Sequence, residues 1–278
     1  MSTVRKCVDG APGARDALGI WHAPRSQARI VSLVPSITEL LFDLGLGAQL
    51  VGRTGFCIHP KHLVRRVPKV GGTKTVDVAR IRALAPTHVI VNVDENTREL
   101  YDELVKFVPQ IVVTHPLAPQ DNVELYRMMG GIFNREQQAE TLGQALAASL
   151  RLAEDCTRGL PRERVLYLIW REPWMTVSRD TYIARTLAVV GWDTWEFSQA
   201  DRYPKIDLCK DLGSRIDRVM LSSEPYRFGD KHLTEVGAAL ELHEPSSVIL
   251  IDGEMCSWYG SRAVQAMRYL SELRLKYQ

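Results

Sequence analysis

The segment Arg29-Ile-Val-Ser-Leu-Val-Pro-Ser-Ile-Thr-Glu39 decides the fold class. Its first part, 29–33, is a short β-branched apolar run of the kind that forms a buried strand. Its last part, Ser36-Ile-Thr-Glu39, has the S-x-x-E pattern of a helix capping box, and three leucines between positions 40 and 44 follow at helical spacing. A strand that leads into a capped helix is the beginning of a βαβ unit.

Runs of the same kind recur along the chain, at 50–52, 88–93, 110–113, 164–170, 218–222 and 248–251. Segments with helical patterns or turn residues separate them, and the clearest helices are predicted at 181–190 and 261–273. Alternating strands and helices predict parallel sheets that are covered by helices.

The middle of the chain breaks this alternation. Leucines and alanines at helical spacing predict one helix from about Glu136 to Cys156, which would be about 30 Å long. We expect Gly130-Gly131 to separate it from a shorter helix before it. The chain is therefore predicted to have an α/β fold, in which one long backbone helix joins two parallel-sheet αβ lobes with a ligand cleft between them. The expected segments are an N-terminal segment with a hairpin (1–28), a first lobe (29–118), a helical connector (119–160) and a second lobe (161–278).

Bulk composition is that of a soluble globular protein. The 278 residues are 45% hydrophobic and 24% charged, and the formal net charge of +2 indicates no basic surface for nucleic acid. No apolar run approaches the roughly 20 residues of a membrane-spanning helix. The polar start, MSTVRKCVDG, precedes no apolar leader segment, and the five scattered cysteines suggest a reducing compartment. We expect a cytoplasmic protein, or a periplasmic one if a leader has been removed.

The motifs of common enzyme classes are absent from the sequence. It contains no G-x-S-x-G elbow, no Walker A motif, no H-E-x-x-H and no G-x-G-x-x-G after a strand. A binding protein is therefore favoured over an enzyme. An enzyme that depends on a metal or on Cys57 as a nucleophile stays open as an alternative on the same fold.

Several motifs, in order from Asp16 to the C-terminus, resemble those of the helical-backbone (class III) solute-binding proteins for vitamin B12, ferric siderophores and haem. The similar stretches are Asp16-Ala-Leu-Gly19, 29–39, Val70-Gly71-Gly72, Ile81-x-x-Leu84-x-Pro86-Thr87-His88-Val89-Ile90, Gly191-Trp192 and Leu221-Ser-Ser-Glu-Pro-Tyr226. The B12-binding branch is the most similar. The resemblance implies the two-lobed fold and a metal-chelate ligand, and it indicates a leaderless cytoplasmic member of the family.

Two positions depart from the family pattern. In members that deliver B12 to a membrane permease, a glutamate on each lobe docks onto permease arginines. The corresponding positions here are Ala79 and Cys209, although Asp77, Asp207 and Asp211 lie within two residues of them. Docking to an ABC transporter permease is therefore doubtful for this chain.

The loop Gly55-Phe-Cys-Ile-His-Pro60 follows a predicted strand of the first lobe. Phe56 is a candidate for stacking on a flat macrocycle, and His59 for ligating a metal as an axial base, with an ordinary loop histidine as the alternative. Cys57 is a possible soft metal donor, but we favour buried packing for it.

Three further candidates of the first lobe are polar. Lys74 is expected to hold a ligand carboxylate or phosphate, and Glu95 and Asn96 are expected to form hydrogen bonds in the cleft. A helix cap at Asn96 or Thr97 is the alternative reading of the last two.

The second lobe carries aromatic and charged candidates after its predicted strands. Those expected to wall the cleft are Trp170, Trp174, Tyr182, Glu224, Trp258 and Tyr259. Arg262 is expected to contact an anion near a helix N-terminus.

Together these features predict a carrier, scavenger or sensor that binds a tetrapyrrole or metal chelate in the inter-lobe cleft. Cobalamin or another corrinoid is the first choice of ligand, with haem or a ferric chelate as alternatives. The main alternative role is that of the exported substrate-binding component of a cobalamin or iron-siderophore/haem ABC transporter.

Overall fold

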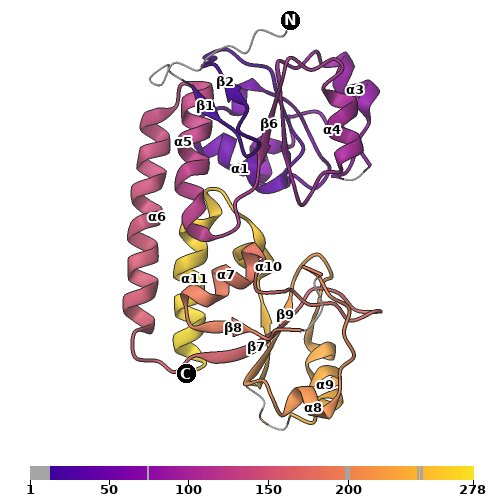
Figure 1. Cartoon of the computed structure of the whole chain (residues 1–278), viewed down its shortest axis with the longest axis vertical. Coiled ribbons are helices and arrows are strands. Elements are labelled where there is room, and N and C mark those ends of the chain that lie inside the picture. Colours follow the sequence, from indigo (N-terminus) through magenta and orange to yellow (C-terminus); the bar gives the residue numbers. More distant parts are fainter. Residues whose placement is uncertain (1–12, 74, 198–200, 243, 245–246) are drawn as a thin grey trace, which may run out of the picture. The chain divides into compact units, whose positions relative to one another are not determined.

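The computed structural model describes residues 13–73, 75–197, 201–242, 244 and 247–278. Contacts divide the chain into two compact units. The first unit comprises Met1–His115 and Val123–Thr141, and the second comprises Pro116–Asn122 and Leu142–Gln278. Each unit is built on its own four-stranded parallel sheet (Figure 1).

The first unit starts with a short antiparallel hairpin and continues into a parallel sheet of order β4-β3-β5-β6. Its strands are β1 (Ala14–Arg15), β2 (Trp21–His22), β3 (Ile30–Ser32), β4 (Leu50–Arg53), β5 (His88–Asn92) and β6 (Gln110–Thr114). Its helices up to β6 are α1 (Pro35–Asp43), the 3-10 turn η1 (Gly47–Gln49), α2 (Lys61–Val64), α3 (Val78–Ala83) and α4 (Arg98–Leu104).

Alternate residues of these strands pack against helices on opposite faces of the sheet. Val89, Val91 and Val113 lie in one cluster with Ile81 of α3 and Leu104 of α4. Helices α3 and α4 accordingly cover one face, while α1 and α5 lie on the other (Figure 1). Burial on both faces explains why each strand is a continuous apolar run in the sequence rather than an alternating one.

The first helix begins two residues earlier than the capping-box pattern predicts. Its N-cap is Val34, and Pro35 occupies the first helical position, where its fixed φ and missing N–H are tolerated. Ser36 lies in the first turn, where its hydroxyl is buried with no hydrogen-bond partner among the described residues. The predicted Ser36 cap is therefore wrong, because Pro35 starts the helix itself.

A buried polar network fixes the hairpin to strand β6. Asp16 Oδ1 accepts hydrogen bonds from the backbone N–H groups of Leu18 and Ile20, both at 2.9 Å. Its other oxygen accepts one from the N–H of Val113 at 3.1 Å and lies 3.2 Å from His22 Nε2. These four partners hold the pKa of the Asp16 carboxyl below 3.8, although burial alone would raise it.

Two helices follow β6. After the 3-10 turn η2 (Pro119–Asp121) come α5 (Asn122–Phe133) and α6 (Glu136–Thr157), which carries the chain from the first unit to the second. The predicted long helix is confirmed and is one residue longer than expected. The predicted break at Gly130-Gly131 is wrong, since α5 runs through both glycines and ends before Asn134, whose φ is +53°.

The glycine pair has a packing role instead. A Cβ at Gly130 would lie 2.8 Å from the Cβ of Ala139, and one at Gly131 would lie 3.1 Å from the carbonyl oxygen of Gly13. The first contact is closer than real Cβ atoms show and the second is tight, so the glycines let α6 and the start of the hairpin approach α5 closely.

The second unit has a parallel sheet of order β10-β9-β7-β8. Its strands are β7 (Glu163–Leu168), β8 (Trp192–Thr194), β9 (Arg218–Ser222) and β10 (Val248–Ile251). Its helices are α7 (Tyr182–Val189), α8 (Lys210–Gly213), α9 (Asp230–Ala239), α10 (Gly253–Ser257) and α11 (Arg262–Lys276).

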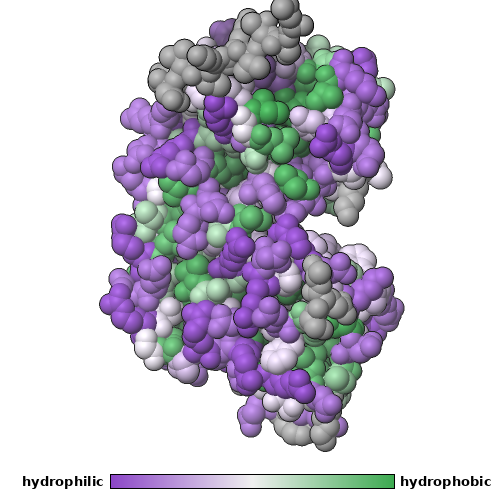
Figure 2. Space-filling view, in the orientation of Figure 1, coloured by the Kyte–Doolittle hydropathy of each residue, from purple (hydrophilic) through white to green (hydrophobic). Residues whose placement is uncertain are grey.

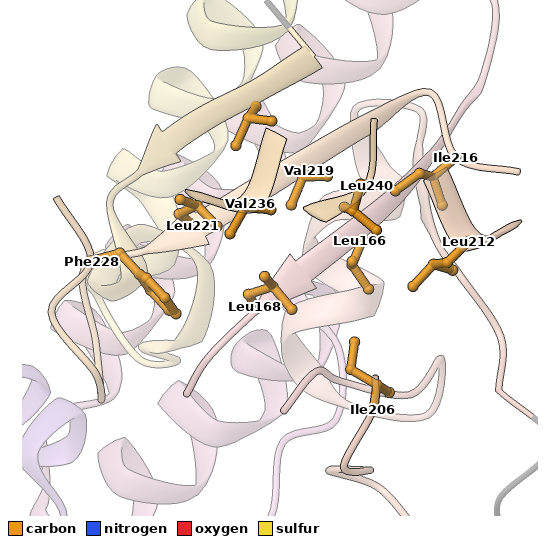
Figure 3. Close-up of a cluster of buried hydrophobic side chains, with 11 residues drawn as sticks. Leu166, Leu168, Ile206, Leu212, Ile216, Val219, Leu221, Phe228, Val236 and Leu240 are labelled. Atoms are coloured by element: carbon orange, nitrogen blue, oxygen red, sulfur yellow. The ribbon is translucent and has the colours of Figure 1, made fainter. Parts of the chain in front are cut away.

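One face of this second sheet carries the cluster drawn in Figure 3. Leu166, Leu168, Val219 and Leu221 of the sheet pack there with residues such as Val236 of α9. In chain order, both sheets have the arrangement second-first-third-fourth strand, so the two units share one topology. The prediction of two parallel-sheet αβ lobes is confirmed.

The surface is mostly polar. On the face drawn in Figure 2, hydrophilic residues predominate and hydrophobic ones gather in small patches. Within the described ranges, no helix combines the length and the hydropathy that crossing a membrane requires.

Candidate ligand-binding site

The carboxyl ends of the strands are the edges of these sheets at which ligands are expected. In open parallel sheets, ligands bind beyond these ends, where the chain connections turn to opposite sides of the sheet. The strand orders place that point between β3 and β5 in the first unit and between β7 and β9 in the second. Most of the candidate residues follow these four strands or their neighbours.

Phe56 is the exposed aromatic residue of the first unit's edge. It follows β4, and its side chain is 62% exposed. The backbone holds the loop in place, because the N–H of Gly55 donates to the carbonyl of Gly71 at 2.7 Å. The ring lies beside Gly72, where a Cβ would come within 3.4 Å of it. Phe56 is therefore presented to solvent from a supported loop, as stacking requires.

Cys57 points the other way, into the core. Its side chain is fully buried, with Thr38 Oγ1 donating to Sγ at 3.0 Å and Thr54 Oγ1 lying at 3.2 Å. Burial raises the pKa of the thiol above 9.0. This agrees with the packing role that the sequence favoured and gives Cys57 neither the access nor the thiolate character of a metal ligand or nucleophile.

The polar candidates of the first unit differ in their surroundings. His59 and Glu95 are half-buried at the carboxyl edge, whereas Lys74 lies outside the described residues. Asn96 braces the loop, since its Oδ1 accepts from the N–H of Asn92 at 2.9 Å and its Nδ2 donates to Thr73 O at 3.1 Å. Thr97 caps α4, as the alternative reading of this segment predicted.

His115, which directly follows β6, was not predicted from the sequence. Its Nε2 lies 3.6 Å from Oδ2 of Asp94, which follows β5. The two strands are hydrogen-bonded neighbours, with Asn92 opposite Thr114. The available signal was a histidine at the end of a buried apolar strand, at the same edge as Glu95.

A small apolar pocket lies beside the same strands. It has a volume of about 170 Å³ and is lined by Leu18, Val91–Val93, Asn96, Thr97, Arg98, Tyr101 and Val113. Its polar side chains are already engaged, since Arg98 pairs with Asp102 at 3.0 Å. The pocket therefore offers apolar surface rather than a charged contact.

Trp170 is the exposed aromatic residue of the second unit's edge. Its side chain is 39% exposed, and its ring meets Tyr226 edge-on with the centroids 5.7 Å apart. Tyr226 packs in turn on Phe228 and on His232, whose Nε2 lies 3.3 Å from the phenol oxygen. Trp174 differs, because its ring is half-buried and stacked on Phe228 at 6.1 Å.

Glu224 is a carboxylate held by neutral donors. Ser257 Oγ and Trp258 Nε1 both donate to Oε1, at 2.6 Å and 2.8 Å. Oε2 has no donor among the described residues and is not one of the buried unpaired atoms, so it reaches solvent. Burial, with Glu254 and Asp252 nearby, raises the pKa of the Glu224 carboxyl above 4.5.

Arg262 is already neutralised. It is 8% exposed, pairs with Glu254 at 3.0 Å, and lies over the Trp258 ring at 4.9 Å. An anion at this guanidinium would have to displace Glu254. The structure thus disfavours the predicted anion contact, because the protein supplies the carboxylate itself.

Three of the predicted cleft aromatics are interior residues. Trp258, Tyr259 and Tyr182 are 8%, 7% and 7% exposed. Tyr182 meets Tyr259 edge-on at 5.7 Å and accepts a hydrogen bond from Asn122 Nδ2 at 3.0 Å. Direct stacking of these rings on a ligand is disfavoured, because they pack in the interior and Trp258 orients Glu224.

The two positions that correspond to docking glutamates are both exposed. Ala79 lies in the first turn of α3, and Cys209 directly precedes α8. Over the part of the chain that the structure describes, no three histidine, cysteine or carboxylate side chains gather into a metal site.

Comparisons with known proteins agree on one group. The family model described as "Periplasmic binding protein" matches residues 30–208. An uncharacterized ABC transporter substrate-binding lipoprotein of Bacillus subtilis is 28% identical over 171 residues, which are 58% of this chain and 53% of the relative. The chain thus spans about half the length of that protein.

Two solved structures share the fold. The periplasmic vitamin B12 binding protein of Vibrio cholerae superposes with a TM-score of 0.78 at 14% identity, covering 91% of this chain and 98% of its own. A periplasmic haem-binding protein of Roseiflexus superposes with a TM-score of 0.72 at 22% identity, covering 90% and 97%.

Proposed function

The chain belongs to the periplasmic binding protein family, and from this premise we propose that it binds a tetrapyrrole or metal chelate, with cobalamin or another corrinoid as the first choice. The family resemblance seen in the sequence is confirmed. The matched family and proteins are all named as binding proteins, so this chain is a binding protein rather than an enzyme. The inter-lobe position of the ligand stays a prediction.

The observation that carries the proposal is a pair of exposed aromatic side chains. Phe56 and Trp170 are 62% and 39% exposed, and each follows a strand at the carboxyl edge of its own sheet. Single exposed aromatic side chains are common on protein surfaces, so the position of these two, at the edges where ligands bind to parallel sheets, is what supports the proposal. A flat macrocycle offers them a face to stack on.

The polar groups favour a corrinoid over haem. Corrinoids carry amide arms that donate hydrogen bonds, whereas haem carries two carboxylates. Glu224 offers an acceptor oxygen without a cation partner, and Arg262, the predicted anion contact, already pairs with Glu254. An amide arm gains a charge-assisted hydrogen bond at Glu224, and a propionate is repelled there.

Haem or a ferric chelate is the second candidate, because one of the similar structures is named as haem-binding. With such a ligand, this chain would act as a transport receptor, the role that the name of the B. subtilis relative indicates. Against a docking role stand Ala79 and Cys209, which carry no carboxylate. We therefore propose a carrier, scavenger or sensor, and a location in the cytoplasm stays a prediction.

The experiment is a set of calorimetric titrations of the purified protein with cobalamin, with haemin and with a ferric catecholate siderophore. We expect saturable binding of cobalamin at the tightest affinity of the three. Preferential binding of haemin or of the siderophore would replace the corrinoid assignment. Swapping Ala79 and Cys209 for glutamate, singly and together, tests for gain of permease docking on B12-transporter vesicles.

A further inference from the structure

His115 and Asp94 form a pair that the proposed stacking contacts leave unused. They follow the neighbouring strands β6 and β5, so both belong to the carboxyl edge of the first unit's sheet. Their side chains are 28% and 29% exposed, and Nε2 of His115 lies 3.6 Å from Oδ2 of Asp94. The pair flanks the β3/β5 point on the side opposite to the Phe56 loop.

The two ring nitrogens of His115 differ in surroundings. Nε2 is buried and has no hydrogen-bond partner among the described residues, with the Asp94 carboxylate as its polar neighbour. Nδ1 has no partner among them either, but it is not one of the buried unpaired atoms, so it is accessible. One nitrogen thus faces a carboxylate while the other is open.

These are two features of a metal-binding imidazole, and closing the 3.6 Å separation between Nε2 and Asp94 would complete the hydrogen bond that such imidazoles make. A histidine ligand usually directs its second nitrogen, as N–H, to a carboxylate that fixes the tautomer and raises the basicity of the coordinating nitrogen. With the proton on Nε2 towards Asp94, the lone pair of Nδ1 is directed away from the carboxylate.

We propose that His115 Nδ1 is the axial nitrogen ligand of the metal in the bound chelate and that Asp94 positions it. The inference rests on the proposed function. The step is a ligand exchange: a metal-bound water leaves, the Nδ1 lone pair forms the new bond, and the proton stays on Nε2. No electrons are transferred, and the oxidation state of the metal does not change.

Two cobalamins separate coordination from mere binding. Aquacobalamin has an exchangeable water on cobalt, whereas in methylcobalamin a carbon–cobalt bond blocks the same position. We expect wild-type protein to bind aquacobalamin at least tenfold more tightly than methylcobalamin. On binding, the visible spectrum of aquacobalamin should change to that of an imidazole complex, whereas the spectrum of methylcobalamin should stay the same.

The variants assign the nitrogen. His115→Ala, and His115→Gln as a variant of similar size, should lose the spectral change and the tenfold preference while binding methylcobalamin as wild type does. Asp94→Asn should weaken aquacobalamin binding by about tenfold, the usual cost of losing such a carboxylate. His59→Ala is the matched control, since His59 is the histidine that the sequence predicted as the axial base, and it should retain the spectral change.

The outcomes are distinguishable. Corrinoid binding without a spectral change in wild type, or a change that persists in both His115 variants, overturns the axial assignment and leaves the proposed function intact. Loss of the change in His59→Ala alone moves the assignment to His59. If neither cobalamin nor haemin binds, the proposed function itself fails. If haemin is the ligand, the same variants are compared by its Soret band.

Discussion

The indole Nε1 of Trp258 donates a 2.8 Å hydrogen bond to Oε1 of Glu224. Ser257 donates to the same oxygen, so both donors fix one side of the carboxylate and leave Oε2 towards solvent. In the proposed site, the buried tryptophan would orient this acceptor for a ligand rather than stack on the ligand itself.

Glu224→Gln should weaken cobalamin binding by roughly tenfold or more, because a hydrogen bond to a charged group contributes about 1.5–3 kcal/mol. It should also reduce discrimination between cobalamin and its monocarboxylic acids, in which one amide arm is replaced by a carboxylate. Calorimetry with both ligands measures this. Glu172→Gln is the control, since Glu172 is 74% exposed and pairs with Arg171. Equal effects of the two substitutions would show that only net charge matters.

Phe56→Ala and Trp170→Ala should each weaken chelate binding by about fivefold, since aromatic contacts contribute roughly 0.5–1.5 kcal/mol beyond the area that they bury. Trp21→Ala is matched in exposure to Trp170, as both are 39% exposed, and it lies in the hairpin. It should leave the affinity unchanged. Quenching of tryptophan fluorescence by the ligand gives the dissociation constants, and unchanged affinity in both edge variants would exclude these rings from the site.

Thiol reactivity should separate the cysteines. Cys209 is exposed and should react first with a maleimide, whereas Cys57 is buried with a raised pKa and should react only after unfolding. Mass spectrometry after timed labelling checks the order. Cys57→Ser should leave ligand binding within twofold of wild type, and thiol-dependent turnover lost in that variant would revive the enzyme alternative.

Stability should depend on pH through His88. Burial, with smaller effects of Arg25 and His22, lowers its pKa from 6.5 to about 4. As the pH falls, the histidine therefore takes up its proton in the unfolded chain before it does so in the folded protein. The free energy of unfolding that this group contributes is fully present above pH 6.5 and decreases down to about pH 4, by up to roughly 3 kcal/mol. Urea unfolding of wild type and His88→Leu across this range isolates the effect, because other titrating groups are common to both. Parallel pH profiles would contradict it.

Asp16 acts in a lower range. Its folded pKa lies below 3.8, so its contribution is present above that pH and is lost as the pH falls through the folded value. Asp16→Asn should destabilise the protein at neutral pH by about 1–3 kcal/mol, because it removes the charge that four donors share. Unfolding at neutral pH measures the difference. A stability equal to that of wild type would show that the hairpin needs no charged anchor.

The sequence predicted the elements best where burial is two-sided. Strands 218–222 and 248–251 have the predicted bounds, because the first is buried at every residue and the second at all but Leu250, so both are largely apolar runs. The break between α5 and α6 was misplaced, since the pattern shows two glycines but not what approaches them. The positions must be glycines because Ala139 and Gly13 lie close to them in the folded protein.

The site was predicted only by position. Residues after strands were expected at the ligand edge, and Phe56, Trp170 and Glu224 lie there. The sequence could not show that Trp258 and Arg262 are paired with Glu224 and Glu254, because the first pair joins residues 34 positions apart and the second joins two different helices, α11 and α10. His115 was missed because its partner Asp94 belongs to a different strand loop.

Calorimetric titration of the wild-type protein with cobalamin and with haemin, under reducing conditions, decides whether this chain binds a corrinoid. We expect saturable binding of cobalamin with micromolar or tighter affinity and a stoichiometry near one, weaker binding of haemin, and reduced cobalamin affinity in Glu224→Gln. The absence of heat and of any spectral change with both chelates would contradict chelate binding.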